Sequence, residues 1–304
     1  MNPDRKQNLP VKRKSLFHKR FAHPGQARQG QHDPIRRWSP TPAIRISGWC
    51  HVAGLAGVCI FPNTWPWVLA VLMGNHIVLG LAGLWPRSRL LGPNMVRLPE
   101  SAVKRGQAAI TFDDGPDPVV TPKVLDILDL YGAKASFFCI GVKASNHPEL
   151  VNEILRRGHS VENHSNRHPG GFAGYGPSAL WRELQAAQAT LRDITGRSPM
   201  FFRAPMGLRS PLLEPVLARM GLRYVSWTRR GFDTVSQDPI GVVQCLTRKL
   251  KAGDILLLHD GSASKAPDGS PLVLSVLPVL LERLAANSLA AVSLPVACDN
   301  DPLR

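Results

Sequence analysis

The chain has 304 residues and a formal net charge of +15, from 37 Lys or Arg residues against 22 Asp or Glu. Most of this charge precedes residue 106, where 16 basic residues stand against 3 acidic ones, while the remainder holds 21 and 19. The length fits one domain of ordinary size with an extension. Five cysteines without Cys-x-x-Cys spacing argue against a small secreted domain held together by disulfides.

Residues 1–42 are polar, basic and rich in Pro, Gly and Gln, which predicts a disordered arm. Basic arms bind nucleic acid or, beside a membrane segment, anionic lipid. Few aromatic residues are interleaved with the basic ones, so nucleic acid is not expected as a partner and membrane lipid is favoured.

Two apolar stretches follow, Ile46–Pro62 and Trp65–Trp85. The second has no charged side chain and is long enough to cross a bilayer, which takes about 20 apolar residues. We therefore expect membrane-anchoring helices over 43–86 and a linker over 87–104. A hairpin packed on a soluble domain is the alternative. A cleaved secretory signal is disfavoured because the apolar region begins far from Met1.

Basic residues flank this region on both sides, and the turn at 62–64 between the two stretches has none. The positive-inside rule then puts both flanks in the cytoplasm. This favours a hairpin in a bacterial-type inner (cytoplasmic) membrane, with the following domain on the cytoplasmic side. If only the second stretch spans, the same domain would lie on the other side.

From residue 106 onward, strand-like and helix-like segments alternate, which is typical of a parallel sheet or barrel with crossover helices. The strand-like segments are 108–112, 135–140, 159–161, 200–202, 222–226, 254–258 and 289–292. The helix-like segments are 122–130, 149–156, 177–195, 211–219, 239–249 and 271–286. The sequence thus predicts an α/β domain.

Two adjacent carboxylates, Asp113 and Asp114, end the first of these strands, just before Gly115-Pro116. Like charges side by side at a buried strand end are costly unless something compensates them. A metal ion would relieve the conflict, with one Asp as a ligand and the other free as a base. A surface turn is the alternative, because Asp-Asp-Gly-Pro is also good turn sequence.

His164 and His168 follow another strand-like segment and are four residues apart, so one helical turn would put both imidazoles on one face. Two imidazoles and a carboxylate are a common set of ligands for first-row metals. Three later segments also place polar groups at strand ends; they contain Arg203, Trp227 with Asp233, and His259. Each of these has an ordinary structural explanation, but five such segments in order indicate a site.

In this order the segments resemble the motifs of the polysaccharide deacetylases, the NodB-like domain of carbohydrate esterase family 4. The matching segments are Thr111–Pro116, His164–His168, Arg203–Gly207, Trp227 with Asp233, and Leu257–His259. The resemblance covers roughly residues 105–295 and implies a distorted (β/α) barrel of NodB type. We place the catalytic domain at 105–297 and a tail at 298–304. Thr234 stands where the family usually has Trp, and Met206 where an aromatic residue is common.

The resemblance implies a divalent metal ion, most simply zinc with cobalt, manganese or nickel as alternatives, held by Asp114, His164 and His168. It implies Asp113 as the general base, oriented by Arg203, and His259 as the general acid, oriented by Asp233. A backbone N–H near Met206 would stabilise the oxyanion. The residues expected to line the substrate site are Pro205, Met206, Gly207, Trp227 and Leu257.

The expected function is metal-dependent de-N-acetylation of N-acetylated amino sugars in a glycan by a membrane-anchored enzyme. One alternative is a deacetylase or deformylase of an undecaprenyl-linked amino sugar, which a site at the cytoplasmic face would favour. The other is a non-catalytic glycan-binding module, which is disfavoured because all the expected catalytic side chains are present. Members of the family mostly act outside the cytoplasm, so family resemblance and flanking charge disagree on the side.

Overall fold

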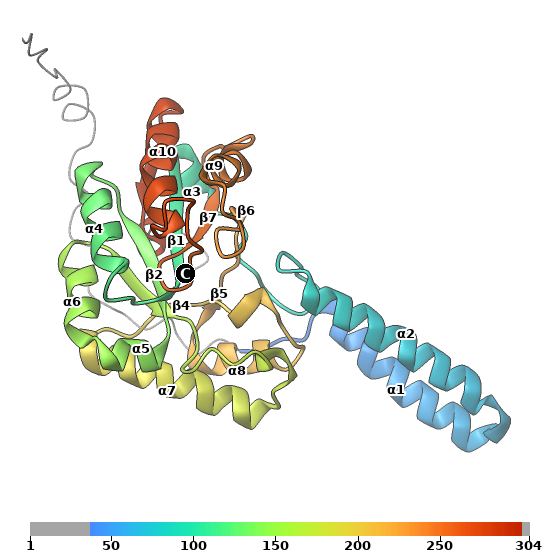
Figure 1. The fold of residues 1–304 in the computed structure, drawn as a ribbon. Coiled ribbons are helices and arrows are strands. Elements are labelled where there is room, and N and C mark those ends of the chain that lie inside the picture. The colour runs from blue at the N-terminus through green and yellow to red at the C-terminus, as the bar shows by residue number, and fades with distance from the viewer. Residues whose placement is uncertain (1–36, 300–304) are drawn as a thin grey trace, which may run out of the picture.

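The computed structural model describes residues 37–299, which form a helical hairpin that projects from an α/β body (Figure 1). The arm predicted over 1–42 lies outside the described residues except at its end. The tail predicted over 298–304 lies outside them except at its start. The structure of both segments stays a prediction.

The hairpin consists of α1 (Pro42–Ile60) and α2 (Trp65–Leu84), joined by the short 3-10 turn η1 (Pro62–Thr64). Helix α1 begins where the sequence supplies a start signal. The Thr41 hydroxyl accepts a hydrogen bond from the Ile44 N–H at 3.3 Å, and a proline occupies the first turn.

Most side chains of the hairpin are exposed, including Trp49 at 71% and Trp67 at 77%. The hairpin contacts the body at its base, where Leu79 and Ala82 of α2 pack against Leu91. This arrangement does not match a hairpin packed along a soluble domain. Both helices are long and apolar enough to cross a membrane, as the sequence predicted.

The described part of the body contains an eight-stranded sheet in the order β5-β4-β3-β2-β1-β7-β6, with β8 also paired to β1. Every paired strand runs parallel, so the sheet forms a parallel half-barrel, as expected. The strands are β1 (Gln107–Gly115), β2 (Ala135–Cys139), β3 (Ser160–Asn163), β4 (Phe201–Phe202), β5 (Arg223–Tyr224), β6 (Arg229–Arg230), β7 (Ile255–His259) and β8 (Ala290–Val292).

Helices connect the strands, and α7 has the bounds that the sequence predicted. The helices of the body are α3 (Glu100–Lys104), α4 (Thr121–Leu130), α5 (Gly141–Asn146), α6 (Pro148–Arg156), α7 (Pro177–Thr195), α8 (Leu213–Met220), α9 (Pro239–Thr247), α10 (Leu272–Ala286) and α11 (Leu294–Cys298). Two 3-10 turns, η2 (Phe172–Gly174) and η3 (Pro205–Gly207), complete it. The short elements α3, α5, α11 and β6 were not predicted.

Strand β1 lies at the centre of the sheet and is buried on both faces, which explains its almost continuous apolar sequence. Ile110 and Phe112 face one hydrophobic cluster, together with side chains of α4 and α10. Ala109 faces a second cluster, with Phe138 and Val225. This packing fixes the carboxyl end of β1, where the two aspartates lie.

The segment expected to be a linker, 87–104, is bonded to the sheet. The Met95 N–H donates to the Tyr224 carbonyl, and the Met95 carbonyl accepts from the Ser226 N–H, both at 3.0 Å. The Leu98 N–H donates to the Gly253 carbonyl at 2.9 Å. Residues 95–98 therefore connect the end of β5 to the start of β7, across the open side of the half-barrel. The expected domain boundary at 105 stays a prediction.

Candidate active site

Asp113 and Asp114 lie at the carboxyl end of β1, where the pairing with β2 is irregular between Asp113 and Gly115. Consecutive side chains of a regular strand point to opposite faces. The irregularity and the positive φ of Asp114, 71°, turn its carboxylate to the same side as that of Asp113. Gly115 leaves room for this, because a Cβ there would lie 2.3 Å from the Asp260 carboxylate.

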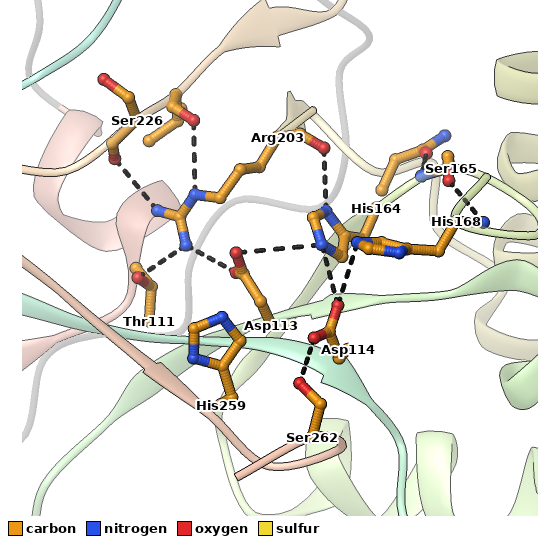
Figure 2. A network of polar contacts seen from close by, with 12 residues as sticks. Thr111, Asp113, Asp114, His164, Ser165, His168, Arg203, Ser226, His259 and Ser262 are labelled. Carbon is orange, nitrogen blue, oxygen red and sulfur yellow. Dashed lines mark hydrogen bonds and ion pairs between the residues drawn. The ribbon is translucent and has the colours of Figure 1, made fainter. Parts of the chain in front are cut away.

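His164 and His168 follow β3 in a tight loop (Figure 2). The expected helical turn was wrong: Ser165 and His168 have positive φ values of 65° and 53°, which no α-helix contains. Side chains hold the loop instead. The Ser165 N–H donates to Asn163 Oδ1 at 2.9 Å, and the His168 N–H donates to the Ser165 hydroxyl at 3.0 Å. The loop still brings both imidazoles together, as expected.

The three expected metal ligands meet at one point. Asp114 Oδ1 lies 3.2 Å from Nε2 of His164 and 3.2 Å from Nε2 of His168, and the donor atoms all lie within 4.8 Å of one another. Asp114 Oδ1 is buried and has no hydrogen-bond donor among the described residues. His164 Nδ1 lies 2.9 Å from the Arg203 carbonyl, so it carries the proton and leaves an Nε2 lone pair facing the aspartate. This donor set fits a divalent metal ion.

The electrostatics of these ligands follow from burial and mutual charge. Burial opposes ionisation of Asp114, but the favourable interaction with His164 outweighs it and holds the Asp114 pKa far below its usual range. Burial also opposes the charged form of His164, and the two aspartates outweigh it, so that the His164 pKa is raised. The pKa of His168 is lowered by burial and by the nearby His164.

Asp113 is held by Arg203, which is completely buried. The guanidinium donates to Asp113 Oδ1 at 2.6 Å and to the Thr111 hydroxyl at 2.8 Å, and it lies 4.1 Å from the Phe138 ring centroid. Its other nitrogens donate to the Val225 and Ser226 carbonyls, so each nitrogen of the buried cation has a hydrogen-bond partner. The second carboxylate oxygen, Oδ2, faces His164 Nε2 at 3.9 Å.

His259 ends β7 and is oriented by Asp233. Its Nδ1 lies 3.0 Å from Asp233 Oδ1, and its backbone N–H donates to Asp233 Oδ2 at 2.8 Å. Burial disfavours the protonated imidazole, but the hydrogen bond and charge of Asp233 outweigh it, so the pKa of His259 is raised. In Figure 2 the two aspartates lie between the His259 ring and the His164–His168 pair.

The expected substrate-lining residues differ in exposure. Met206, at the tip of η3, is 51% exposed and has a φ of 56°. Pro205 and Gly207 are buried beside it, and a Cβ at Gly207 would lie 2.5 Å from the Trp227 ring. Trp227 is 4% exposed and Leu257 1%. Their contact with a substrate stays a prediction.

Sequence reasoning missed residues that reach the site from the loop after β7 and from α5. The Ser262 hydroxyl donates to Asp114 Oδ2. Lys143 Nζ donates to the Asp114 carbonyl at 2.8 Å. Asp260 accepts a hydrogen bond from Thr121 at 2.5 Å, and burial raises its pKa to about 7. Ser262 and Asp260 lie within three residues of His259, which was the available signal, whereas nothing in the sequence marked Lys143.

Comparisons with known proteins agree with this geometry. The family model "Polysaccharide deacetylase" matches residues 100–225. The chain is 32% identical over 186 residues to a peptidoglycan-N-acetylglucosamine deacetylase of Bacillus cereus, covering 58% of this chain and 82% of that one. It is 34% identical over 165 residues to a chitooligosaccharide deacetylase of Sinorhizobium fredii, covering 54% and 76%.

Solved structures show the same architecture. A family 4 carbohydrate esterase from Streptomyces lividans, in complex with acetate, is 30% identical, with a TM-score of 0.55 over 61% of this chain and 91% of that one. The Bc1960 peptidoglycan N-acetylglucosamine deacetylase has a TM-score of 0.60 at 24% identity, over 66% and 91%, and supports the fold. The chain therefore belongs to the polysaccharide deacetylase (NodB, carbohydrate esterase 4) family, and it is a hydrolase of carbon–nitrogen bonds other than peptide bonds.

Proposed function

We propose that this enzyme removes the acetyl group from N-acetylglucosamine units of a glycan. The observation that carries the proposal is the convergence of Asp114 with His164 and His168 beside a separately held Asp113 and His259. The names of the relatives above support the substrate class, since one acts on N-acetylglucosamine of peptidoglycan and the other on chitooligosaccharides.

Asp114, His164 and His168 would hold a divalent metal ion, for which zinc is our first choice because tetrahedral N/O sites with an open position suit it. When bound, the ion supplies Lewis-acid activation of water and of the amide carbonyl. Neutral His164 presents its Nε2 lone pair because the Arg203 carbonyl holds the Nδ1 proton. Ser262 would fix the second oxygen of Asp114.

Asp113 would accept the proton of the attacking water. Its Oδ1 is engaged by Arg203, which leaves Oδ2 as the available base atom on the side of His164. Arg203 is fully buried and orients the carboxylate, and its Nε and Nη2 hydrogen bonds go to backbone carbonyls of the protein. A backbone N–H near Met206, in the turn beside Trp227, would stabilise the oxyanion that forms.

His259 would then donate a proton to the leaving nitrogen, which departs as a free amine while acetate is released. Asp233 favours the protonated ring and fixes its orientation through Nδ1, so that Nε2 carries the proton to be donated. The acid and the base thus lie on different strands, β7 and β1, and His259 is paired in register with Asp113.

The hairpin would anchor the enzyme in a membrane, with the flanking basic residues supporting a cytoplasmic site. One contact favours an amino sugar carried by a membrane lipid as a second candidate substrate. The Arg209 N–H, two residues after η3, donates to the Gly83 carbonyl of α2 at 3.1 Å. A Cβ at Gly207 would also lie 3.3 Å from Pro86. The base of the hairpin therefore contacts the proposed substrate turn.

The test is acetate release by purified full-length protein in detergent. We expect activity on an N-acetylglucosamine tetramer, its loss on chelation and its recovery with added Zn²⁺, Co²⁺, Mn²⁺ or Ni²⁺. The same protein should be assayed on a lipid-linked N-acetylglucosamine to compare the two candidates. A metal-loaded protein that releases acetate from neither substrate would overturn the proposal.

A further inference from the structure

In the part of the chain that the structure describes, no carboxylate forms an ion pair with Arg230 of β6 (Arg229–Arg230). Its neighbour Arg229 pairs with Asp254 at 2.8 Å and donates to the Lys249 carbonyl at 2.6 Å. Within residues 37–299, the Arg230 side chain has neither an ion pair nor a hydrogen bond, and its Nε is buried without a partner. Desolvated, unpaired donors are costly, so a cation left this way in a partly buried position calls for a ligand.

Two aromatic rings flank this guanidinium. Its Cζ lies 5.7 Å from the Trp227 ring centroid and 5.1 Å from that of Phe232. Phe232 is 51% exposed and has a φ of 61°, a left-handed conformation that is unfavourable for a bulky side chain. An exposed ring held in a strained conformation is the kind of feature that persists at binding sites.

Arg230 and Phe232 lie next to the proposed catalytic residues on two sides. Trp227 abuts the turn at Gly207, and the Cζ of Arg203, which holds Asp113, lies 5.9 Å from the same ring. Phe232 directly precedes Asp233, which orients His259. Only the Trp227 ring thus separates Arg230 from Arg203, and Phe232 is the sequence neighbour of Asp233. Both partners are proposed to orient groups that act on the acetamide.

We propose that Arg230 and Phe232 form a subsite for a negatively charged group, a carboxylate or a phosphate, on the glycan next to the reacting acetamide. This inference rests on the proposed deacetylase function. The guanidinium presents a planar fork of donors that suits either oxyanion, and Trp227 and Phe232 hold that fork in place. The exposed face of Phe232 packs against the apolar face of the sugar that carries the charge.

The experiment compares kcat/KM for three soluble substrates with the full-length protein. The first is the neutral N-acetylglucosamine tetramer. The second is a tetrasaccharide in which N-acetylglucosamine alternates with carboxylate-bearing N-acetylmuramic acid. The third is an N-acetylglucosamine oligomer with a reducing-end phosphate. The wild type should prefer at least one anionic substrate by about tenfold, the value of one charge-assisted hydrogen bond. Arg230→Gln should remove this preference, and Arg230→Lys should keep part of it.

The matched control is Arg219→Gln. Arg219 lies on α8, and its Cζ also lies over a tryptophan ring, 5.0 Å from the Trp181 centroid. This variant should keep the wild-type preference. A second measurement needs no substitution: added salt should lower the preference of the wild type, since the contact is ionic. If only one of the two anionic substrates is preferred, that result would show whether the subsite takes a carboxylate or a phosphate.

Equal ratios for wild type and Arg230→Gln, or a salt-independent ratio, would overturn the subsite while leaving the deacetylase function intact. Inactivity of the metal-loaded wild type on all three substrates and on a lipid-linked amino sugar would overturn the proposed function and the subsite with it.

Discussion

Asp113 and Asp114 are adjacent in sequence but have different surroundings. Asp113 still belongs to the β1 ladder and is bonded to Arg203, whereas Asp114 has left the ladder with a positive φ and faces two imidazoles. Like charges at this distance destabilise each other unless each has its own compensation. Arg203 compensates the charge of Asp113, and the proposed metal ion would compensate the charge of Asp114.

This difference predicts distinct effects of two isosteric substitutions. Asp113→Asn should keep the metal and lower kcat by about 10²- to 10⁴-fold, because the amide cannot accept a proton. Asp114→Asn should instead lower the metal content, as should His164→Ala or His168→Ala. Metal analysis of the purified proteins, with acetate release measured on the same samples, separates the two. If Asp113→Asn lost its metal and Asp114→Asn kept it, base and ligand would have to be exchanged.

A second prediction concerns pH. As the proposed general acid, His259 would act in its protonated form, and Asp233 raises its pKa, so the enzyme should stay active to higher pH than an ordinary histidine would allow. Asp233→Asn removes the charge that outweighs burial, so the alkaline limb of the kcat profile should move to lower pH. An unmoved limb, with the fold and metal content intact, would show that another group titrates there.

At the residue scale, the sequence predicted which polar side chains converge at the site, because each follows a strand-like segment and parallel strands end at the same edge. Their roles as metal ligands, base, acid and orienting partners are what the family resemblance implies, and they stay predictions. The sequence did not predict how the backbone delivers these side chains. Of the seven non-glycine residues with positive φ in the described chain, Asp114, Ser165, His168, Met206 and Phe232 surround the site. Such conformations depend on side-chain hydrogen bonds across loops, which local propensity does not encode.

At the scale of elements, the segment before α3 connects the hairpin to the site through Asn94. Its Nδ2 donates to the Pro86 and Ser88 carbonyls at 2.8 and 3.0 Å, and its Oδ1 accepts from the Ser226 hydroxyl at 2.8 Å. The Ser226 carbonyl in turn accepts from Arg203. Residues 86–94 are therefore linked through one buried side chain to the group that orients Asp113.

Asn94→Ala should therefore destabilise the protein by about 1–3 kcal/mol, because several buried polar groups lose their partner. It should also lower kcat more than it raises KM, since Ser226 supports Arg203. Thermal unfolding and steady-state kinetics give both values. The matched control is Asn287→Ala, which removes an exposed hydrogen bond at the end of α10 and should change neither. Equal effects of the two substitutions would contradict a linking role for Asn94.

Sequence patterns located the long elements of the body because their periodicity is carried by many residues, as in α7 and β1. They missed β6 and the paired segment 95–98 because these are very short and are defined by hydrogen bonds to distant strands rather than by their own sequence. The sequence predicts a linker over 87–104, but Leu91, Leu98 and Ala102 in this segment are buried. Tertiary context decided the structure there.

At the scale of the whole molecule, the hairpin projects from the body, while the segment after it belongs to the half-barrel. A chain that begins at Arg87 removes the exposed helices with the packing of Leu79 and Ala82 on Leu91, the contact of Gly83 with Arg209, and the Pro86 carbonyl that accepts from Asn94. A chain that begins at Gly106, one residue after the expected boundary at 105, also removes Leu91, Leu98 and Ala102 from the core. Burying a leucine contributes about 1.5–3 kcal/mol, so this loss is a large part of the stability of one domain.

We therefore expect the chain beginning at Arg87 to be monodisperse without detergent, to bind metal and to unfold cooperatively. The chain beginning at Gly106 should aggregate or unfold at a clearly lower temperature, because it also loses the ion pair between Arg97 and the fully buried Asp254. If the substrate is a soluble glycan, the longer truncated chain should release acetate as fast as the full-length protein. If it is lipid-linked, only the full-length protein should act efficiently, since the hairpin holds enzyme and substrate in one plane. Aggregation of the chain beginning at Arg87, beside an active full-length protein in detergent, would mean that the hairpin stabilises the body and does not merely anchor it.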